Sequence, residues 1–458
     1  MTGGSGAAPL PVVDIDLAEP GAFRRPGGGV RTRPSGRALG LVRYNGRPLG
    51  MAEASGRGPE ELWRALAAAA LREFTVTDED IGLGEPHSTF VEAPVISVIV
   101  ATRNRTGMLR DCLDSLLALK YARFEVIVVD NAPADTSTEE LVRREYGGTR
   151  DGGALRRKYG RTRDGGEVLP NHRPTVRYLR EPVPGLARAH NRGLTAARGD
   201  ITAFTDDDTL VDPLWLTALA APFLADPRTG CVTGLIVPAE LDTEAQVALE
   251  RHGAFAKGYA PRTWSLSVPS TDPLFPFTAG RFGSGANMAF RTELLRGLGG
   301  FDPATGVGTP AHGGDDLLSF FRVLARGRSL AYEPAAIVWH RHRRTPEALD
   351  AQAFGYGAGF GAYLAAAIVH EPRMLPALLR RLPGGVRYAI ARNRERAGPA
   401  TGRGAAPSRL ARLELRGMLY GPYGYLRSRR IERRIRRRAE PRHGDLARRD
   451  PRRRGGDR

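Results

Sequence analysis

Three consecutive aspartates, Asp206, Asp207 and Asp208, directly follow a short apolar run at residues 201–205. Such a run bounded by polar residues is typical of a buried strand, and open α/β sheets bind ligands outside the carboxyl ends of their strands. Because adjacent carboxylates repel one another and divalent cations prefer oxygen ligands, the triplet indicates a metal site. An acidic turn before a helix capped by Asp212 is the alternative, since Asp is a common cap.

Two further groups of side chains could perform acid–base or metal chemistry. Asp315 and Asp316 open the amphipathic segment DDLLSFFRVLA, and His340 follows an apolar run. Two adjacent carboxylates raise the pKa of one of them, which suits a general base, although acids also stabilise the first turn of a helix. His340 could complete a metal site or contact a phosphate, or it could be a partly buried polar residue.

A β-α-β unit is predicted to position part of this chemistry. VISVIVATRNR, from residue 95, is a nearly continuous apolar strand of the kind found in parallel sheets covered on both faces. A helix capped by Thr106 follows, and then a second strand, EVIVVDNAP, with Asp130 and Asn131 near its end. This order is typical of the nucleotide-binding half of an α/β sheet. The absence of GxGxxG and GxxxxGK[ST] sequences disfavours a dinucleotide site and a P-loop.

The remaining elements of the main domain continue the same alternation. GLARAHNRGLTAARGD is predicted as a helix, CVTGLIV as a buried strand, and LAYEPAAIVWHRH as the strand that ends at His340. The segment 241–282 is rich in Pro and aromatic residues and is predicted to be irregular. Because long irregular segments in compact domains are commonly lids or binding loops, it is expected to help choose an acceptor.

Composition favours a globular protein of the cytoplasm. The 458 residues are 41% hydrophobic, enough for one large core with flanking segments. Of the net charge of +18, residues 427–458 carry +10, so basicity is mainly a property of the tail. Cys112 and Cys231 both lie in apolar patterns and are predicted to be reduced core thiols. The amino terminus lacks a secretory signal pattern, which favours the cytoplasm.

Composition and periodicity also divide the chain into five parts. The amino-terminal part, 1–35, is rich in Gly, Pro and Arg and is predicted to be disordered. Next comes a small α+β segment, 36–90, with a hairpin around Asn45-Gly46 and a helix over 60–74. The main domain covers 93–345 with a flexible insertion at 146–174, and it precedes a helical extension, 346–426, and an Arg-rich disordered tail, 427–458.

The carboxyl-terminal part raises the question of membranes. Residues 351–369 are uncharged and approach the length of a bilayer span, although their many Gly and Ala residues also suit a helix packed on a core. The later stretches mix apolar residues with Arg, as interfacial helices do, so an anionic membrane surface is a candidate partner. A nucleic-acid-binding arm is the competing hypothesis, but no recognisable nucleic-acid module accompanies the tail.

Taken in order, these segments resemble the family 2 glycosyltransferases over residues 94–344. The matching features are VATRNR, VVDN, GLARAHNRG, TDDD, GSGANMAFR, GGFD and GGDD before an amphipathic helix. His190 departs from the Arg usual before the Asn of that helix, and Asp315 departs from the usual Glu. The resemblance implies an α/β fold of the GT-A type: a mostly parallel central sheet flanked by helices, here with a small N-terminal α+β segment and a helical, Arg-rich C-terminal extension.

The resemblance also implies a reaction. The chain would be a metal-dependent, inverting, hexosyltransferase-like enzyme that moves a sugar from a UDP-, GDP- or dTDP-linked donor to an unknown acceptor hydroxyl. Asp206 and Asp208 would be the outer acids of a DxD motif. Asp208 would bind Mg²⁺ or Mn²⁺, Asp206 would hold the ribose side or share the metal, and His340 would complete the site. Asp316 would be the general base, with Asp315 as the second candidate for that role.

Other residues receive binding roles from the same resemblance. The donor nucleotide and its phosphates would be contacted by Thr102, Asn104, Asp130, Arg188, Asn191 and Asp207, with Asn191 also fixing a loop. Asn287 would shape the acceptor side. Turn and cap chemistry is the alternative for the first three of these residues. A catalytically inactive, sugar-nucleotide-binding scaffold and a nucleotidyltransferase on a related sheet are the competing hypotheses for the whole chain.

Overall fold

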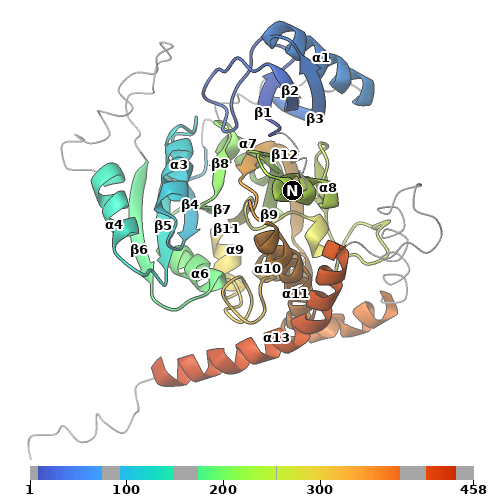
Figure 1. Ribbon diagram of the computed structural model, residues 1–458. Helices are drawn as coiled ribbons and strands as arrows, with labels where there is room; N and C mark the ends of the chain where they lie inside the picture. Colours follow the sequence, from blue (N-terminus) through green and yellow to red (C-terminus); the bar gives the residue numbers. More distant parts are fainter. Residues whose placement is uncertain (1–8, 75–92, 148–173, 254, 382–408, 440–458) are drawn as a thin grey trace, which may run out of the picture.

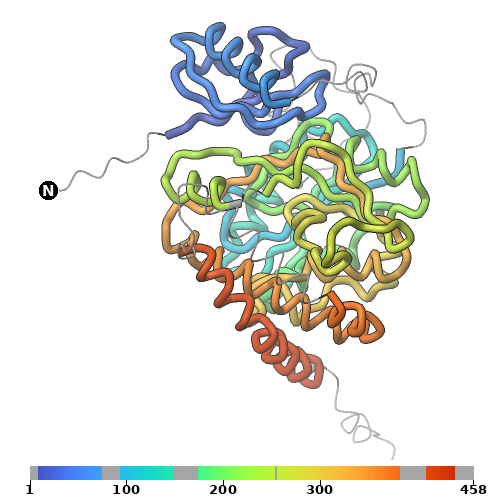
Figure 2. Tube along the Cα trace, turned by 90° about the vertical axis from the view of Figure 1, so that its right-hand side faces the viewer, coloured from blue at the N-terminus to red at the C-terminus, as the bar shows by residue number. Residues whose placement is uncertain are grey.

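The computed structural model describes residues 9–74, 93–147, 174–253, 255–381 and 409–439. An amino-terminal unit lies at one end, a large sheet with its helices occupies the middle, and a pair of long helices closes the other end (Figures 1 and 2). The predicted insertion at 146–174 lies almost wholly outside the described residues.

A nine-stranded sheet forms the centre of the described structure, in the order β10-β12-β9-β11-β7-β4-β5-β6, with β8 paired to β12 (Figure 1). Six strands share one direction, whereas β8, β10 and β11 run against their neighbours. The predicted fold class, a mostly parallel sheet flanked by helices, is confirmed. The strands are β4 (Ile96–Thr102), β5 (Phe124–Asn131), β6 (Thr175–Glu181), β7 (Ile201–Asp206), β8 (Thr209–Val211), β9 (Thr229–Pro238), β10 (Arg262–Trp264), β11 (Met288–Arg291) and β12 (Ser329–His340).

Helices cover both faces of the sheet, which explains why its strands read as continuous apolar runs. Successive side chains of a strand point to opposite faces, so Val98 packs in one hydrophobic cluster with α3 and α7, while Ile99 packs in the other with α6 and α10. The helices of this domain are α3 (Thr106–Leu117), α4 (Ser137–Leu141), the π-helix η1 (Val142–Tyr146), α6 (Leu186–Ala196), α7 (Trp215–Ala225), α8 (Glu244–Gly253), the 3-10 helix η2 (Ala279–Arg281), α9 (Thr292–Gly297) and α10 (Asp315–Ala325).

The order of the strands reverses at β4. The next two strands of the chain, β5 and β6, lie on one side of it, and β7 lies on the other. The register pairs Ala101 of β4 with Asp206 of β7, so the two strands end at the same level. Such a switch point leaves a crevice at the carboxyl ends of the strands, where α/β proteins bind ligands.

The amino-terminal unit consists of β1 (Val12–Asp16), β2 (Gly36–Tyr44), β3 (Arg47–Gly56) and α1 (Pro59–Glu73). The predicted hairpin is confirmed, because Asn45 and Gly46 both have positive φ, 49° and 78°, between β2 and β3. Two such residues form the turn that matches strand twist.

The prediction of disorder over 1–35 is wrong for the described part. All five residues of β1 are buried, and β1 pairs in parallel with β2. Arg43 donates two hydrogen bonds of 2.8 Å to Asp14 of β1 and also lies 2.7 Å from Asp212 of the main domain. These partners are distant in sequence, so composition alone could not reveal them.

Two long helices form the carboxyl-terminal part: α11 (Pro346–His370), followed by the 3-10 helix η3 (Pro372–Met374), and α13 (Arg409–Ala439). Helix α13 extends past residue 427, so the predicted start of the disordered tail is wrong, and residues 440–458 lie outside the described residues. None of the described helices, α11 included, combines the length and the apolar character needed to cross a bilayer.

Glycines bring α11 and α13 into close contact. A Cβ at Gly357 would lie 1.8 Å from the Glu414 carbonyl oxygen, and one at Gly421 would lie 2.3 Å from that of Ala358. We expect Gly357→Ala to lower the free energy of unfolding by about 1–3 kcal/mol through this clash. Gly355→Ala is the matched control, since its Cβ would lie 3.9 Å from the nearest atom. Denaturant titrations check this expectation, and equal stabilities of the two variants would contradict it.

Candidate active site

A cavity of about 960 Å³ opens at the carboxyl ends of β4 and β7. Its walls come from the strand ends, from α6 and α10, from the end of β12 and from α11. The cavity brings together seven of the site residues predicted from the sequence: Thr102, Asp206, Asp207, Asp208, Asp315, Asp316 and His340.

Two of the three consecutive aspartates face a histidine across this cavity. One ligand atom each from Asp206, Asp208 and His340 lies within 4.8 Å of the others. His340 Nε2 is 3.3 Å from Asp208 Oδ1, without the alignment of a hydrogen bond. This buried oxygen has no hydrogen-bond partner among the described residues. Two carboxylates and an imidazole form a donor set that fits a divalent cation.

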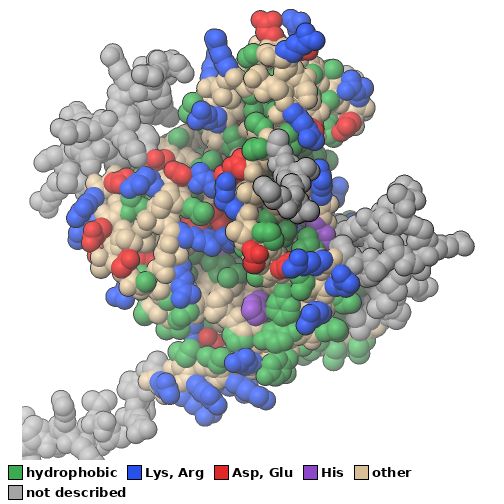
Figure 3. Space-filling view, in the orientation of Figure 1, with side chains coloured by type: hydrophobic (Ala, Val, Ile, Leu, Met, Phe, Trp, Pro, Cys, Tyr) green, Lys and Arg blue, Asp and Glu red, His purple; other side chains and the backbone are tan. Residues whose placement is uncertain are grey.

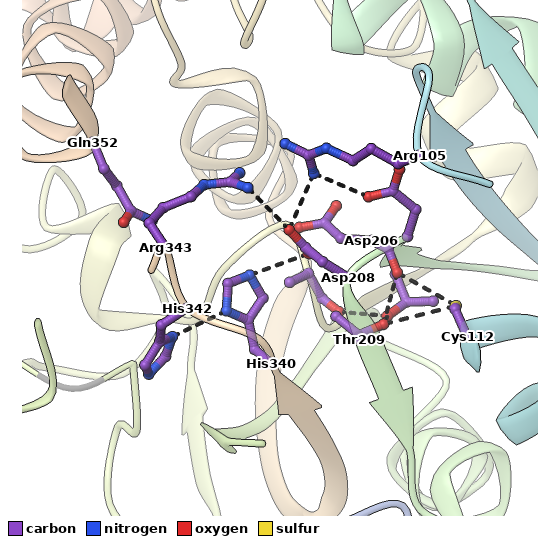
Figure 4. A network of polar contacts seen from close by, with 12 residues as sticks. Arg105, Cys112, Asp206, Asp208, Thr209, His340, His342, Arg343 and Gln352 are labelled. Atoms are coloured by element: carbon purple, nitrogen blue, oxygen red, sulfur yellow. Dashed lines mark hydrogen bonds and ion pairs between the residues drawn. The ribbon is translucent and has the colours of Figure 1, made fainter. Parts of the chain in front are cut away.

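Three basic side chains converge on Asp208, Arg105 from the turn after β4 and His340 and Arg343 from the end of β12 and the segment after it (Figure 4). Arg105 Nη1 lies 3.2 Å and Arg343 Nη1 3.5 Å from Asp208 Oδ2, and His340 approaches the other oxygen. Burial by itself raises the pKa of Asp208, but these neighbours together hold it well below its usual range. Burial and the charge of Asp208 raise the pKa of Asp206 to about 6. Asp208 is therefore the more readily ionised member of the pair.

Asp207 connects the two strand ends. It accepts a hydrogen bond of 2.7 Å from the hydroxyl of Thr102, the last residue of β4, and one of 3.2 Å from Arg105, three residues later. Its carboxylate is buried, and burial followed by the charge of Asp208 raises its pKa. Asp207 thereby holds the end of β7 beside the end of β4.

A chain of polar contacts orients His340. Its Nδ1 lies 3.2 Å from Nδ1 of His342 (Figure 4). His342 Nε2 in turn lies 3.1 Å from Glu250 Oε2 in α8. Contacts of this kind behind a metal-binding histidine fix the direction of its ring. The pattern HRH, two residues apart at a strand end, is the sequence signal for the pair, whereas nothing nearby in the sequence indicates Glu250.

Asp316 lies in the first turn of α10. Its Oδ2 accepts the N–H of Gly285 at 2.8 Å, and its Oδ1 accepts the N–H of Leu317 at 2.8 Å. Burial first, and the neighbouring Asp315 second, raise its pKa to about 6. Gly314, with φ of 89°, precedes the helix, and a Cβ there would lie 2.3 Å from the Gly359 carbonyl oxygen of α11. Only glycine therefore lets α10 begin so close to α11.

His190 occupies the wall between the two acidic groups. Its buried ring packs against Phe204 and Phe301, with centroid distances of 5.0 and 4.9 Å. Its Nδ1 is 3.5 Å from Asp315 Oδ2, but neither ring nitrogen has a hydrogen-bond partner among the described residues. The sequence marked His190 only as a departure from the family pattern.

Arg188 and Asn191 make contacts outside the cavity wall. Arg188 forms a two-pronged ion pair with Glu432 of α13, with one N–O distance of 3.2 Å. The amide of Asn191 accepts the N–H of Phe301 and donates to its carbonyl, both at 2.8 Å. Asn191 thus holds the loop at Phe301, whereas Arg188 is paired with Glu432 of α13.

Three more predicted residues do not line the cavity: Asn287 and Asp130 are buried, and Asn104 is exposed. Asn287 is buried, accepts from the Trp215 indole at 2.9 Å and donates to two strand carbonyls. Asp130 accepts from the Tyr178 hydroxyl at 3.1 Å, and burial raises its pKa. Asn104, with φ of 55°, accepts the Ala134 N–H at 3.0 Å. All three support the strands and turns that bear the cavity.

Comparison with known proteins gives matches over the region that forms the cavity. Residues 97–151 match the family model "Glycosyl transferase family 2", and residues 167–355 match "Glycosyltransferase like family 2". The chain is 27% identical over 286 residues to the pre-mycofactocin glycosyltransferase of Mycobacterium tuberculosis, a match that covers 62% of this chain and 50% of the relative. This chain therefore spans about half the length of that relative.

A second relative and two solved structures complete the comparison. Over 219 residues, the chain is 21% identical to the glucosyl-dolichyl phosphate glucuronosyltransferase of Haloferax volcanii, covering 46% of this chain and 57% of the relative. A mannosyltransferase of Pyrobaculum calidifontis in complex with GDP-Man and Mn²⁺ aligns with a TM-score of 0.40 at 20% identity, over 76% of each chain. GalNAc-T7 with UDP, GalNAc and Mn²⁺ aligns at 0.37 and 17%, over 64% and 55%.

Proposed function

Because this chain belongs to glycosyltransferase family 2, we propose that it transfers a sugar from a nucleotide-diphospho-sugar to an acceptor hydroxyl in a metal-dependent, inverting reaction. The observation that carries the proposal is the single cavity lined by both the Asp206–Asp208–His340 group and Asp316. The first group is suited to hold a cation that neutralises a diphosphate, and Asp316 is suited to accept a proton from the acceptor hydroxyl.

The metal part of the proposal rests on the donor set. Asp206, Asp208 and His340 would hold Mg²⁺ or Mn²⁺, and the buried Oδ1 of Asp208, which accepts no hydrogen bond from the described residues, is available as a ligand. When bound, such an ion would neutralise charge that develops on the diphosphate leaving group. Arg105 and Arg343, already beside Asp208, would add donors that suit phosphate oxygens.

Asp316 is proposed to take the proton. Its carboxylate is held by two backbone N–H groups, and its raised pKa of about 6 leaves it ionised yet basic near neutral pH. As the acceptor oxygen loses its proton to Asp316, it bonds to the anomeric carbon. The bond from that carbon to the diphosphate oxygen breaks, and the nucleoside diphosphate leaves. One such displacement inverts the anomeric configuration without a covalent sugar–enzyme intermediate.

The expected donors are UDP-, GDP- or dTDP-linked sugars, whose base and ribose would lie toward the ends of β4 and β5. Thr102 and Asn131 line the cavity there. The proposal also includes a peripheral position on an anionic membrane surface. It is supported by the face of α13 that points away from α11, which exposes both leucines and arginines.

A panel of nucleotide sugars tests the donor and the metal together. We expect the wild-type protein to release nucleoside diphosphate slowly from one donor with Mn²⁺ or Mg²⁺, and EDTA to abolish the release. The anomeric configuration of the transferred sugar, read by NMR, checks inversion. Donor binding without metal-dependent turnover would instead favour an inactive sugar-nucleotide-binding scaffold, and a retained configuration would contradict Asp316 as the base of a single displacement.

A further inference from the structure

One face of α13 exposes a row of large apolar side chains. Leu415, Leu419, Tyr423 and Leu426 are 55, 76, 59 and 51% exposed. Their spacing of three and four residues places them along one stripe of the helix. The opposite face is held against α11 by the glycine contacts at Gly357 and Gly421. Apolar side chains so arranged and so exposed mark a surface that binds a partner.

Arginines flank and extend this row. Arg412 and Arg416 accompany its beginning, and Arg427 and Arg430 follow its end. Five more exposed arginines occupy the last turns of the described helix: Arg433, Arg434, Arg436, Arg437 and Arg438. Figure 3 shows Arg side chains and hydrophobic side chains together along the lower edge of the molecule, where α13 lies.

Both acids of α13 are directed away from this face. Glu414 lies 3.1 Å from His252 Nε2 of α8, and Glu432 pairs with Arg188 of α6. Within the described part of α13, the outward face therefore combines apolar side chains with arginine and carries no carboxylate. This arrangement is complementary to an apolar layer beneath a negatively charged surface.

We propose that the outward face of α13 docks on an anionic lipid bilayer, with the row from Leu415 to Leu426 inserted among the lipids and the arginines at the headgroups. Interfacial helices combine these two features, and arginines near an anionic leaflet add attraction. Nucleic acid fits less well, because a phosphate backbone offers nothing to the exposed leucines. The inference deepens the peripheral membrane position in the proposed function but does not depend on the donor chemistry.

Flotation of the full-length protein with vesicles tests the surface. The vesicles are phosphatidylcholine alone, or phosphatidylcholine with 30% phosphatidylglycerol, at about the physiological ionic strength where the Debye length is about 8 Å. We expect flotation only with the anionic vesicles. Leu415→Ser/Leu419→Ser and Arg427→Gln/Arg430→Gln should each lower the bound-to-free ratio at least tenfold. No nucleotide sugar is added, so the result stands apart from any test of transfer.

Matched controls remove similar side chains elsewhere. Val30→Ser/Leu71→Ser and Arg37→Gln/Arg64→Gln alter exposed apolar or basic residues of the amino-terminal unit, and both should float like the wild type. Equal flotation with neutral vesicles, or flotation unchanged by the leucine pair, would overturn the proposal. If Arg427→Gln/Arg430→Gln abolished flotation and the leucine pair did not, the surface would be purely electrostatic, and its binding to duplex DNA would be tested next.

A second readout does not require any variant that weakens binding. Tyr423→Trp places a fluorophore in the middle of the row. We expect its emission to shift to the blue on anionic vesicles and to stay unchanged on neutral ones, since only an inserted indole leaves water. Flotation without a blue shift would contradict insertion of the row.

Discussion

Asp208→Asn is expected to lower kcat/KM for sugar transfer by about 10³-fold, because the loss of a Lewis acid worth several kcal/mol changes a rate by that factor. Asp208 is the carboxylate on which Arg105, Arg343 and His340 converge, and its buried Oδ1 accepts no hydrogen bond from the described residues. An amide retains the shape but offers a weaker, uncharged oxygen to a cation. Steady-state kinetics across Mn²⁺ concentrations, with calorimetric Mn²⁺ binding, measure the effect.

The control is a carboxylate outside the cavity. Asp111 on α3 lies 2.8 Å from Arg341 in a half-exposed pair, and such surface pairs contribute about 0–1 kcal/mol. Asp111→Asn should therefore change neither Mn²⁺ binding nor turnover. If the Asp208→Asn variant bound Mn²⁺ as tightly as the wild type and transferred sugar at a similar rate, Asp208 would not be a metal ligand.

Asp316→Asn is expected to lower kcat by about 10²- to 10⁴-fold, the range for losing a positioned general base. Donor KM should change little, because among the described residues the carboxylate accepts hydrogen bonds from the N–H groups of Gly285 and Leu317, and it faces the acceptor in the proposed reaction. An asparagine oxygen can accept only one of these bonds with the same geometry, so folding is checked by thermal denaturation. A variant with unchanged kcat would show that another group takes the proton.

The pH profiles of the wild type and of Asp315→Asn together test the same residue, because the pKa of Asp206 is also raised to about 6. A base must be unprotonated, and the pKa of Asp316 is raised to about 6. In the wild type, kcat/KM should fall as pH falls through about 6 and should level off above about 7. Because the charge of Asp315 contributes to the raised pKa, Asp315→Asn should retain activity and move this limb to lower pH. If Asp315 were the base, the same variant would lose activity at every pH.

The sequence by itself determined the elements and the acids of the site. The strands β4, β5 and β7 are local apolar runs with polar ends, so their boundaries and the placement of Asp206 and Asp208 at a strand end follow from short-range pattern. The hairpin at Asn45-Gly46 is likewise local, because two residues with positive φ define it. Parallel strands ending at one edge then bring Thr102 near the aspartates.

Which side chains contact the site residues was decided only by the tertiary structure. Arg188 pairs with Glu432, 244 positions away, and Glu250 reaches His342 from another helix; no periodicity or spacing encodes either contact. Asn287 lies in a motif of the family pattern, but burial among Trp215, Leu235 and Ala336 places it behind the wall.

The same distinction explains the two errors at the ends of the chain. Composition favoured disorder for 1–35 and from residue 427 onward, because Gly, Pro and Arg bury little apolar surface by themselves. The structure orders β1 through pairing with β2 and through Arg43. Helix α13 packs on α11 through glycine contacts that all lie before residue 427, and beyond residue 427 Glu432 pairs with Arg188 of α6. A segment's own residues determine its local preference. Whether it becomes ordered depends on the free energy of contacts with distant residues, and only the folded chain brings those residues together.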